Sequence, residues 1–159
     1  MKIRVQTEPF DLAAEVAAFY RDNPRVGAVA SFLGLVRDGH PNRSPSGEGD
    51  GDGVNTLTLE HYPGMTEKSL EQIVRDALAR WDLLDVTVIH RVGELQPTDP
   101  IVLVAVASAH RGEAFAACEF IMDYLKTRAP FWKKEMTPDG ERWVDAKESD
   151  DLAAERWRG

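Results

Sequence analysis

The sequence has one cysteine and no long apolar run, which limits the class of protein that it encodes. Cys118 has no second cysteine with which to form an internal disulfide, as is typical of a protein from a reducing cytoplasm. No apolar run approaches the roughly 20 residues that span a bilayer, and the N-terminal MKIRVQTEPF has no apolar signal-peptide core. The formal net charge of -8 argues against nucleic acid as the main partner. We therefore expect a cytoplasmic protein that binds neither membranes nor nucleic acid.

Several catalytic and cofactor motifs are also absent. The sequence has no P-loop, no GxGxxG fingerprint, no HExxH metal motif and no GxSxG nucleophile motif. The four histidines show no tight metal-ligand spacing, and one cysteine cannot complete a structural zinc site. Cys118 falls on the apolar face of a predicted helix, where a small core residue is much commoner than a catalytic thiol. We expect no bound metal and no cofactor.

The pattern of apolar residues predicts strands and helices in an irregular order. Strands are predicted over 2–6, 26–36, 54–62, 84–92, 101–108 and 141–146. Helices are predicted after caps at Asp11 and Thr66 and from residue 111 to a stop at Pro130, and a final helical turn or two over 150–157 in the tail. The segments do not follow a strict βαβ rhythm. We therefore predict one α+β domain over 1–159, with mixed or antiparallel sheets and packed helices.

Two connecting segments stand out by their composition. GELQPTDP (93–100) is typical of a turn, so the strands on either side of it are expected to pair as a hairpin. Residues 38–53 contain five glycines and two prolines, which predicts a flexible loop. This loop is either an inert insertion, which we favour, or a cover for a site. Gly27 and Gly34, in the preceding strand, mark expected points of close backbone approach.

The most informative stretch is 101–134, in which an apolar strand leads into a helix and then into FWKK. From 110 to 134 there are five basic residues against three acidic ones, a local charge of +2. A basic cluster in an acidic chain favours a local site for an anion. His110 and Arg111 lie at the helix start, where free backbone N–H groups also favour an anion.

Lys126 lies in the last turn of the same helix. At the standard helical rise it is about 22 Å along the axis from Arg111. Either the chain has two anion sites, or a symmetric dimer brings the helix start of one chain to the helix end of another. We favour the dimer.

Lys126 and Lys133 flank 127–132, in which a proline and two adjacent aromatic residues are expected to wall a pocket. Lysine supplies a point charge or, when its pKa is lowered, a base or nucleophile. Solvated surface charge is the alternative for each basic residue here. For Arg128 and Lys134 we favour this alternative over a functional role. For Lys126 and Lys133 we favour the functional role, because they flank the expected pocket wall at 127–132.

Four fragments in a fixed order resemble one family. LEHYPGM, HRVGEL, AHR and YLKTRAPFWKKE closely resemble the large, catalytic subunit of molybdopterin synthase, and the similarity runs from about residue 26 to the tail. The resemblance implies an α/β-hammerhead-type α+β fold and a central homodimer. It also implies a small ubiquitin-like subunit at each end of a heterotetramer, whose C-terminal Gly-Gly thiocarboxylate supplies sulfur. Two successive transfers convert cyclic pyranopterin monophosphate into the dithiolene of molybdopterin.

The resemblance also implies the residues of the site. Lys126 matches the essential lysine near the thiocarboxylate, and Lys133 matches the second functional lysine. The substrate-binding residues that it implies are Leu35, Val36, Arg37, His110, Arg111, Lys126, Lys133, Lys134 and Glu135. Lys147 occupies a tail position where the family often has a basic residue.

Two other functions stay open at this point. A scaffold that holds a ubiquitin-like protein without chemistry would bind its partner whether or not Lys126 is present. An enzyme for another phosphate-bearing ligand, such as a nucleotide, would turn over without a protein partner. Neither explains the lysines that flank the proline–aromatic wall as well as the synthase function does.

Overall fold

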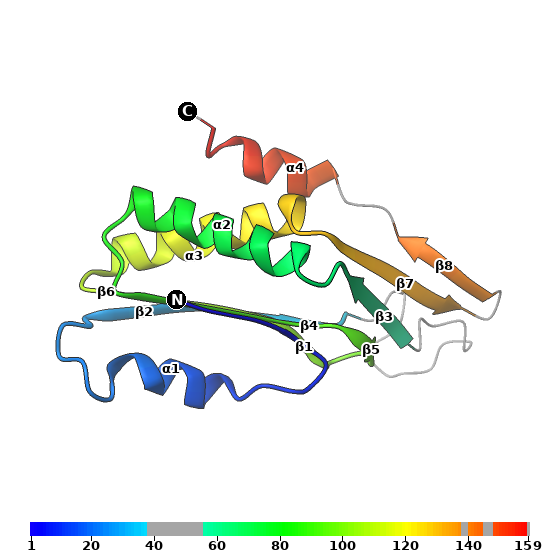
Figure 1. Cartoon of the computed structure of the whole chain (residues 1–159), viewed down its shortest axis with the longest axis horizontal. Helices are drawn as coiled ribbons and strands as arrows, with labels where there is room; N and C mark the ends of the chain where they lie inside the picture. The colour runs from blue at the N-terminus through cyan, green and yellow to red at the C-terminus, as the bar shows by residue number, and fades with distance from the viewer. Residues whose placement is uncertain (38–55, 138–139, 145–147, 159) are drawn as a thin grey trace, which may run out of the picture.

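The computed structural model describes residues 1–37, 56–137, 140–144 and 148–158. These residues form two four-stranded sheets and four helices, and Figure 1 shows the second sheet extending from one end of the first. In chain order the elements are β1 (Lys2–Gln6), α1 (Leu12–Tyr20), β2 (Ala28–Leu35), β3 (Thr56–His61), α2 (Met65–Arg80), β4 (Asp85–Arg91), β5 (Gly93–Leu95), β6 (Pro100–Ser108), α3 (Arg111–Arg128), β7 (Phe131–Thr137), β8 (Gly140–Val144) and α4 (Glu148–Glu155).

The first sheet has the strand order β1-β4-β6-β2. β1 runs parallel to β4, whereas β4 with β6 and β6 with β2 are antiparallel pairs. The predicted hairpin of β4 and β6 is therefore confirmed. β6 is buried over most of its length, because helices cover both faces of the sheet and a continuous apolar strand suits that position.

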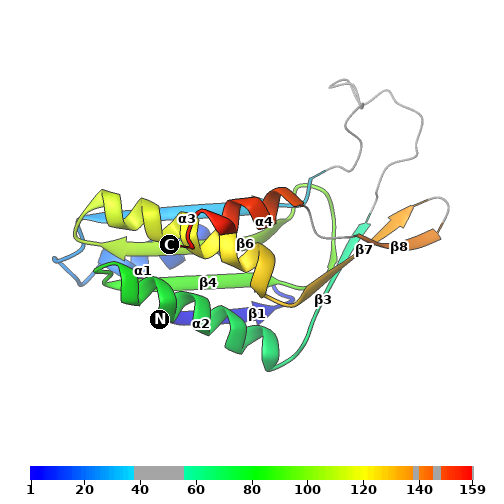
Figure 2. The ribbon, with the colours of Figure 1, turned by 90° about the horizontal axis from the view of Figure 1, so that it is seen from above.

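Helices α2 and α3 lie side by side on one face of this sheet, and α1 covers the other (Figures 1 and 2). On the first face Val104 of β6 packs with Ile121 of α3 in the main core. On the second face Leu103 and Ala105 of the same strand pack with Phe19 of α1. This alternation follows from the two-residue period of a strand.

The second sheet has the order β5-β3-β7-β8, and its three strand pairs are antiparallel. Leu57, Leu59 and Leu95 form part of a small core of its own. Val5 and Ile101, at the edge of the first sheet, pack against both this core and the main one. The predicted α+β class is confirmed. A single domain over 1–159 stays a prediction.

Both glycines singled out in the second predicted strand lie at close approaches. A Cβ on Gly27 would stand 2.1 Å from the carbonyl oxygen of Ala109, and a Cβ on Gly34 would stand 2.6 Å from the side chain of Val102. The pairing register of β2 also shifts just after Gly34. The expected role of these residues is confirmed, because a side chain would meet the backbone at Gly27 and the side chain of Val102 at Gly34.

Two predictions of local structure were wrong. Residues 93–95 were expected in a turn, but they form β5 and pair with β3. Residues 127–132 were expected to wall a pocket and no strand was predicted over 131–137, but residues 131–137 form β7 between β3 and β8. Both strands are short or polar in sequence, and both exist because β3 pairs with them from a distant part of the chain.

Asp11 and Thr66 were both predicted to cap helices, and only Asp11 does so. Its side chain accepts a hydrogen bond from the backbone N–H of Ala14 at 3.2 Å. The second helix begins one residue before Thr66, after Gly64, which has a φ of +85°. Such a backbone angle favours glycine, so the start of α2 is set by glycine and not by a hydroxyl.

The predicted helical tail is confirmed by α4, which is followed by an anchoring tryptophan. The indole N–H of Trp157 donates to Asp123 of α3 at 2.6 Å, and Arg156 pairs with the same carboxylate at 2.7 Å. The loop 38–53 lies outside the described residues. Within the described part of the chain, no helix is both long and apolar enough to cross a membrane.

Candidate functional site: two lysines around a buried histidine

The two candidate lysines lie on either side of the corner between α3 and β7. Lys126 is exposed in the last turn of α3, and Lys133 is half-buried in β7. Ala129 leaves the helical conformation, with φ -82° and ψ 126°, because the residue before a proline avoids the helical region. The proline therefore turns the chain out of the helix and directs it into the second sheet.

The register of β7 separates Lys133 from Lys134. Lys133 stands opposite Leu59 of β3, and Lys134 stands opposite Thr58. Side chains directly opposite each other share a face of the sheet, so Lys133 lies on the face that carries the buried Leu59. Lys134 lies on the other face. The two adjacent lysines therefore cannot serve the same part of a site from this strand.

His90 lies at the centre of this region. It is 6% exposed, at the end of β4. Its ring stacks on Phe131 with the ring centres 3.9 Å apart and the planes at 19°, and its Nδ1 lies 2.8 Å from the carbonyl oxygen of Arg91. Because a carbonyl only accepts, Nδ1 carries the proton. His90 is therefore a strand residue with a hydrogen-bonded side chain.

The electrostatics of His90 show which cations surround it. The pKa of His90 is lowered to about 4, chiefly by burial; the hydrogen bond to Arg91 opposes this shift, and Lys126, Lys133 and His61 contribute to it. These three basic side chains therefore lie within electrostatic reach of one ring. His61 also pairs with Glu67, with Nε2 3.5 Å from Oε1. Neither histidine was among the predicted site residues.

The buried ring predicts how stability depends on pH. The unfolded chain protonates this histidine below about pH 6.5, whereas the folded protein does so only below about pH 4. Unfolding therefore takes up a proton between these values, and stability falls as the pH drops through that window. Between about pH 7 and about pH 4.5 we expect wild type to lose about 2 kcal/mol more than His90→Phe, which cannot titrate. Urea unfolding at both pH values measures this difference; equal losses would contradict it.

Arg37 and its neighbours lie at the same end of the first sheet as His90. His90 pairs with Val102, and Val102 pairs with Gly34 across the sheet. Leu35 is 52% exposed, Val36 is buried in the small core, and Arg37 is exposed. Chain direction therefore brings Arg37 to the end of the sheet where Lys126 and Lys133 lie.

His110 and Arg111 lie at the opposite end of the first sheet. His110 is the N-cap of α3 and Arg111 its first residue, and both side chains are exposed. The helix runs unbroken to Arg128, so the expected separation of about 22 Å from Lys126 holds. Within one chain the structure gathers Arg37, Lys126 and Lys133 at one end and leaves this pair at the other.

Two predicted residues lie wholly or partly outside the description. The backbone of Glu135 stands opposite Leu57 in β7, but its side chain lies outside the described residues. Lys147 lies outside them altogether. Arg128, interpreted as a surface charge, pairs with Asp76 at 3.2 Å, as that interpretation expects.

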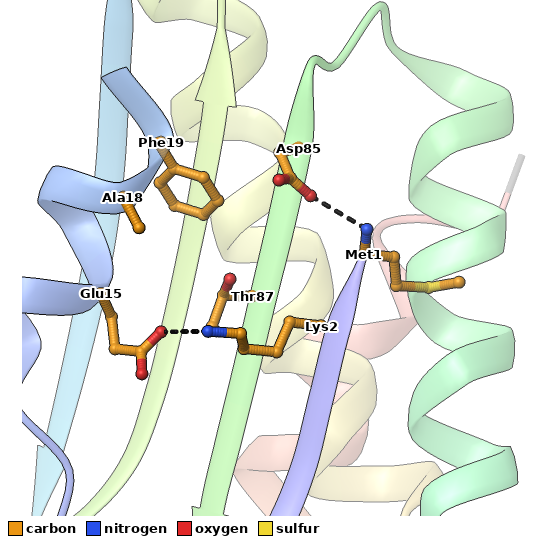
Figure 3. Close-up of a pocket in the computed structure, with 7 residues that line it drawn as sticks. All are labelled: Met1, Lys2, Glu15, Ala18, Phe19, Asp85 and Thr87. Carbon is orange, nitrogen blue, oxygen red and sulfur yellow. Dashed lines mark hydrogen bonds and ion pairs between the residues drawn. The ribbon is translucent and has the colours of Figure 1, made fainter. Parts of the chain in front are cut away.

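A cavity of about 300 Å³ between α1 and the strands β1 and β4 has no part in this arrangement. Figure 3 shows that its charges face one another: the amino group of Met1 lies 3.0 Å from Asp85, and Lys2 lies 2.9 Å from Glu15. These paired charges leave no net charge to attract an anion. Among the described residues there is also no group of three His, Cys, Asp or Glu side chains placed to hold a metal.

Cys118 is buried in the main core, as predicted. Burial raises the pKa of its thiol to about 11, and the charge of Glu119 adds to this. A thiol at that pKa holds almost no thiolate near neutral pH, and thiolate is the nucleophilic form. The one cysteine of the chain is therefore not a sulfur carrier.

The fold and the site define a class: an α+β protein that presents cations at the junction of two sheets and has no reactive thiol of its own. Comparison with known proteins names the family. The chain matches the family described as "MoaE protein" over residues 5–128, and it belongs to that family.

Several similar proteins are named for the synthesis of molybdopterin. It is 63% identical over 155 residues to a molybdopterin synthase catalytic subunit of Ralstonia nicotianae, covering 98% of this chain and 83% of that protein. It is 56% identical over 156 residues to the subunit of that name from Escherichia coli, covering 98% and 97%. A solved structure of the molybdopterin biosynthesis MoaE protein from Burkholderia ambifaria superposes with a TM-score of 0.79 at 57% identity, covering 98% of this chain and 97% of that one.

Proposed function

We propose that this chain transfers sulfur from the C-terminal thiocarboxylate of a small ubiquitin-like subunit to cyclic pyranopterin monophosphate, which forms the dithiolene of molybdopterin. The observation that carries the proposal is that Lys126, at the end of α3, and Lys133, in β7, lie on either side of a turn whose Phe131 stacks on the buried ring of His90. Membership of the MoaE family supports it, because the relatives are named as catalytic subunits of molybdopterin synthase. The chain is a sulfurtransferase of molybdenum cofactor biosynthesis.

The chemistry requires positive charge more than a nucleophile. The thiocarboxylate and the pterin phosphate are both anions, so cations must hold them together against their repulsion. The buried Cys118 cannot carry the sulfur, which therefore arrives on the partner. A lysine ammonium beside the acyl carbon stabilises the oxyanion that develops there, or transfers a proton. The thiocarboxylate sulfur bonds to a pterin carbon, so that a thioester joins the small subunit to the pterin. Water then attacks the acyl carbon of this thioester and the bond from that carbon to sulfur breaks, which leaves the sulfur on the pterin as a thiolate and releases the small subunit as a carboxylate.

The catalytic residues that we assign are Lys126 and Lys133, with Arg37, toward the same end of the first sheet, for the phosphate. Leu35, Val36, Lys134 and Glu135 complete the proposed binding residues of this end, and Lys147 is a further candidate from the tail. The reaction as proposed needs no metal and no further cofactor, since these side chains supply the positive charge. We place the protein in the cytoplasm, where its free thiol stays reduced.

We further propose that the working form is a homodimer with one small subunit bound at each end. His110 and Arg111 lie a helix length from Lys126, so they complete a pterin-phosphate site only when another copy supplies them. The relatives are named as subunits, which fits an enzyme built from two kinds of chain.

The experiment that tests the function is product formation in a defined mixture. The purified chain is mixed with cyclic pyranopterin monophosphate and a small subunit that ends in a thiocarboxylate, and molybdopterin is detected as its fluorescent oxidation product. The matched control is the same small subunit with an ordinary C-terminal carboxylate. We expect product only with the thiocarboxylate. Partner binding without product would favour a scaffold, and product without any partner would favour a different enzyme.

The shared site predicts complementation between two inactive variants. A heterodimer of Lys126→Ala and Arg111→Ala chains contains one site with both defects and one intact site. We expect about half of wild-type activity from it, and almost none from either variant homodimer. Co-expression with two different tags isolates the heterodimer for the assay. A heterodimer as inactive as its parents would contradict the shared site.

A further inference from the structure

Two residues of other elements contact the chain between Lys126 and Lys133, one by a hydrogen bond and one by ring stacking. We call residues 127–132 the linker, since they leave α3 and enter β7. Thr66 of α2 contacts the linker at its proline, and His90 of β4 contacts it at the next residue. Neither contact residue belongs to the predicted site.

Thr66 joins the linker to the start of α2 through one hydroxyl. Its side chain is fully buried, at 0% exposure. The hydroxyl donates to the carbonyl oxygen of Pro130 at 2.9 Å and accepts from the backbone N–H of Tyr62 at 3.0 Å. Both hydrogen-bonding functions of the hydroxyl are used. The end of β3, the start of α2 and the middle of the linker are therefore tied at one point.

His90 fixes the next residue of the linker by stacking. Its ring lies 3.9 Å from the ring of Phe131, and its own orientation is set by the bond from Nδ1 to the carbonyl oxygen of Arg91 at 2.8 Å. The ring is buried at the end of β4 in the first sheet. The start of β7 therefore keeps a fixed position relative to the first sheet.

We propose that Thr66 and His90 are positioning residues that hold the linker from two sides, so that Lys126 and Lys133 converge on one reaction centre. The inference rests on the function proposed above, because it needs both lysines to act in one reaction. The exposed end of α3 and the adjoining strand β7 do not by themselves fix the distance between Lys126 and Lys133. A misplacement of about 1 Å in a reacting group can cost about 100-fold in rate.

The test uses substitutions at Thr66 that differ in one hydroxyl. Thr66→Val keeps the shape and removes both hydrogen bonds, whereas Thr66→Ser keeps the hydroxyl. We expect kcat of the first to fall at least about tenfold, with KM for the pterin within about twofold, and kcat of the second to stay within about threefold. Ile73→Val, a buried change in the same helix, is the control for lost stability and should leave kcat unchanged.

A matched pair at His90 tests the second contact. His90→Phe keeps a flat ring against the linker, and His90→Ala removes it. We expect the alanine variant to lose at least about tenfold in kcat and the phenylalanine variant to keep most of it. If Thr66→Val fails to fold, this pair carries the test alone. Unchanged kcat in a folded Thr66→Val or His90→Ala would overturn the proposal.

A double-substitution cycle separates positioning from general damage. With Lys133 removed, the distance between the two lysines no longer matters, so adding Thr66→Val to Lys133→Ala should lower kcat by less than about twofold. If kcat of the double variant falls by the product of the two single-variant losses, the proposal is overturned. Hydrogen exchange of the backbone amides over 129–134 measures how firmly the linker is held, independently of catalytic activity. We expect this exchange to be faster in Thr66→Val than in Ile73→Val.

The lysine variants in the same assay distinguish a failure of the proposed function from a failure of the positioning proposal alone. If Lys126→Ala and Lys133→Ala keep normal activity, the proposed function of these lysines fails, and the positioning proposal falls with it. If both lose activity while a folded Thr66→Val and a folded His90→Ala keep theirs, the lysine assignment stands and only the positioning proposal fails.

Discussion

Replacing Lys126 with alanine is expected to abolish sulfur transfer and to leave the fold and partner binding intact. The side chain is exposed at the end of α3, so its truncation costs little stability. Loss of one preorganised charge-stabilising group typically costs about 100- to 1,000-fold in kcat, and loss of proton transfer adds to this. We therefore expect a fall of at least about 1,000-fold in the initial rate of molybdopterin formation.

The matched control for this variant is Arg128→Ala, two residues further along the chain. Arg128 pairs with Asp76 at 3.2 Å and lies 3.9 Å above the ring of Tyr124, so its charge is engaged on the surface of α2 and α3. We expect its removal to change the rate by less than about threefold and stability by about 1 kcal/mol at most. Near-normal turnover by Lys126→Ala would refute the assignment, and equal losses in both variants would point to general charge in place of a specific lysine.

The second large effect is expected at Lys133, with its neighbour as control. Lys133→Ala should lower kcat by about 100-fold, because this lysine shares the inner face of β7 with Leu59 and acts on the electrostatics of the buried His90. Lys134→Ala removes the same charge one residue away, on the opposite face, at a residue that we assign to binding and not to the chemical step, so we expect kcat to stay within about fivefold. Initial rates of both variants at saturating partner measure the contrast. A larger loss at Lys134 would mean that the outer face of β7 carries the site.

Long periodic segments were the part of the fold that sequence could predict. β6 and α3 have the continuous apolar run and the helical spacing that their burial requires, and Pro130 ends the helix where expected. β7 could not be predicted in the same way. Its sequence, FWKKEMT, has two adjacent aromatic residues and then three charged ones, without the alternation typical of a half-buried strand. It is a strand because β3 pairs with it from 74 positions earlier, Leu59 with Lys133. Such non-local pairing leaves a weak signal in local sequence.

The same limit applies to the site. Lys126 and Lys133 are found in sequence because they flank a proline and two aromatic residues in a basic cluster. His90 is not found, because a single histidine in an apolar strand is most often a core residue. Its significance comes from its contact with Phe131, which lies beyond α3 in the sequence and far from His90 along the chain. Thr66 is misread as a cap for a similar reason, since its partner Pro130 lies 64 residues away.

The central claim is that the sulfur of the product comes from the small subunit and passes through this site. The most direct test is to label the thiocarboxylate of the small subunit with a heavy sulfur isotope and to supply unlabelled cyclic pyranopterin monophosphate. The mass of the product is then measured by mass spectrometry. We expect each molybdopterin to carry two labelled sulfurs with wild-type protein and no labelled product to form with Lys126→Ala. Unlabelled molybdopterin from the wild-type reaction, or labelled molybdopterin at a normal rate from the variant, would contradict the central claim.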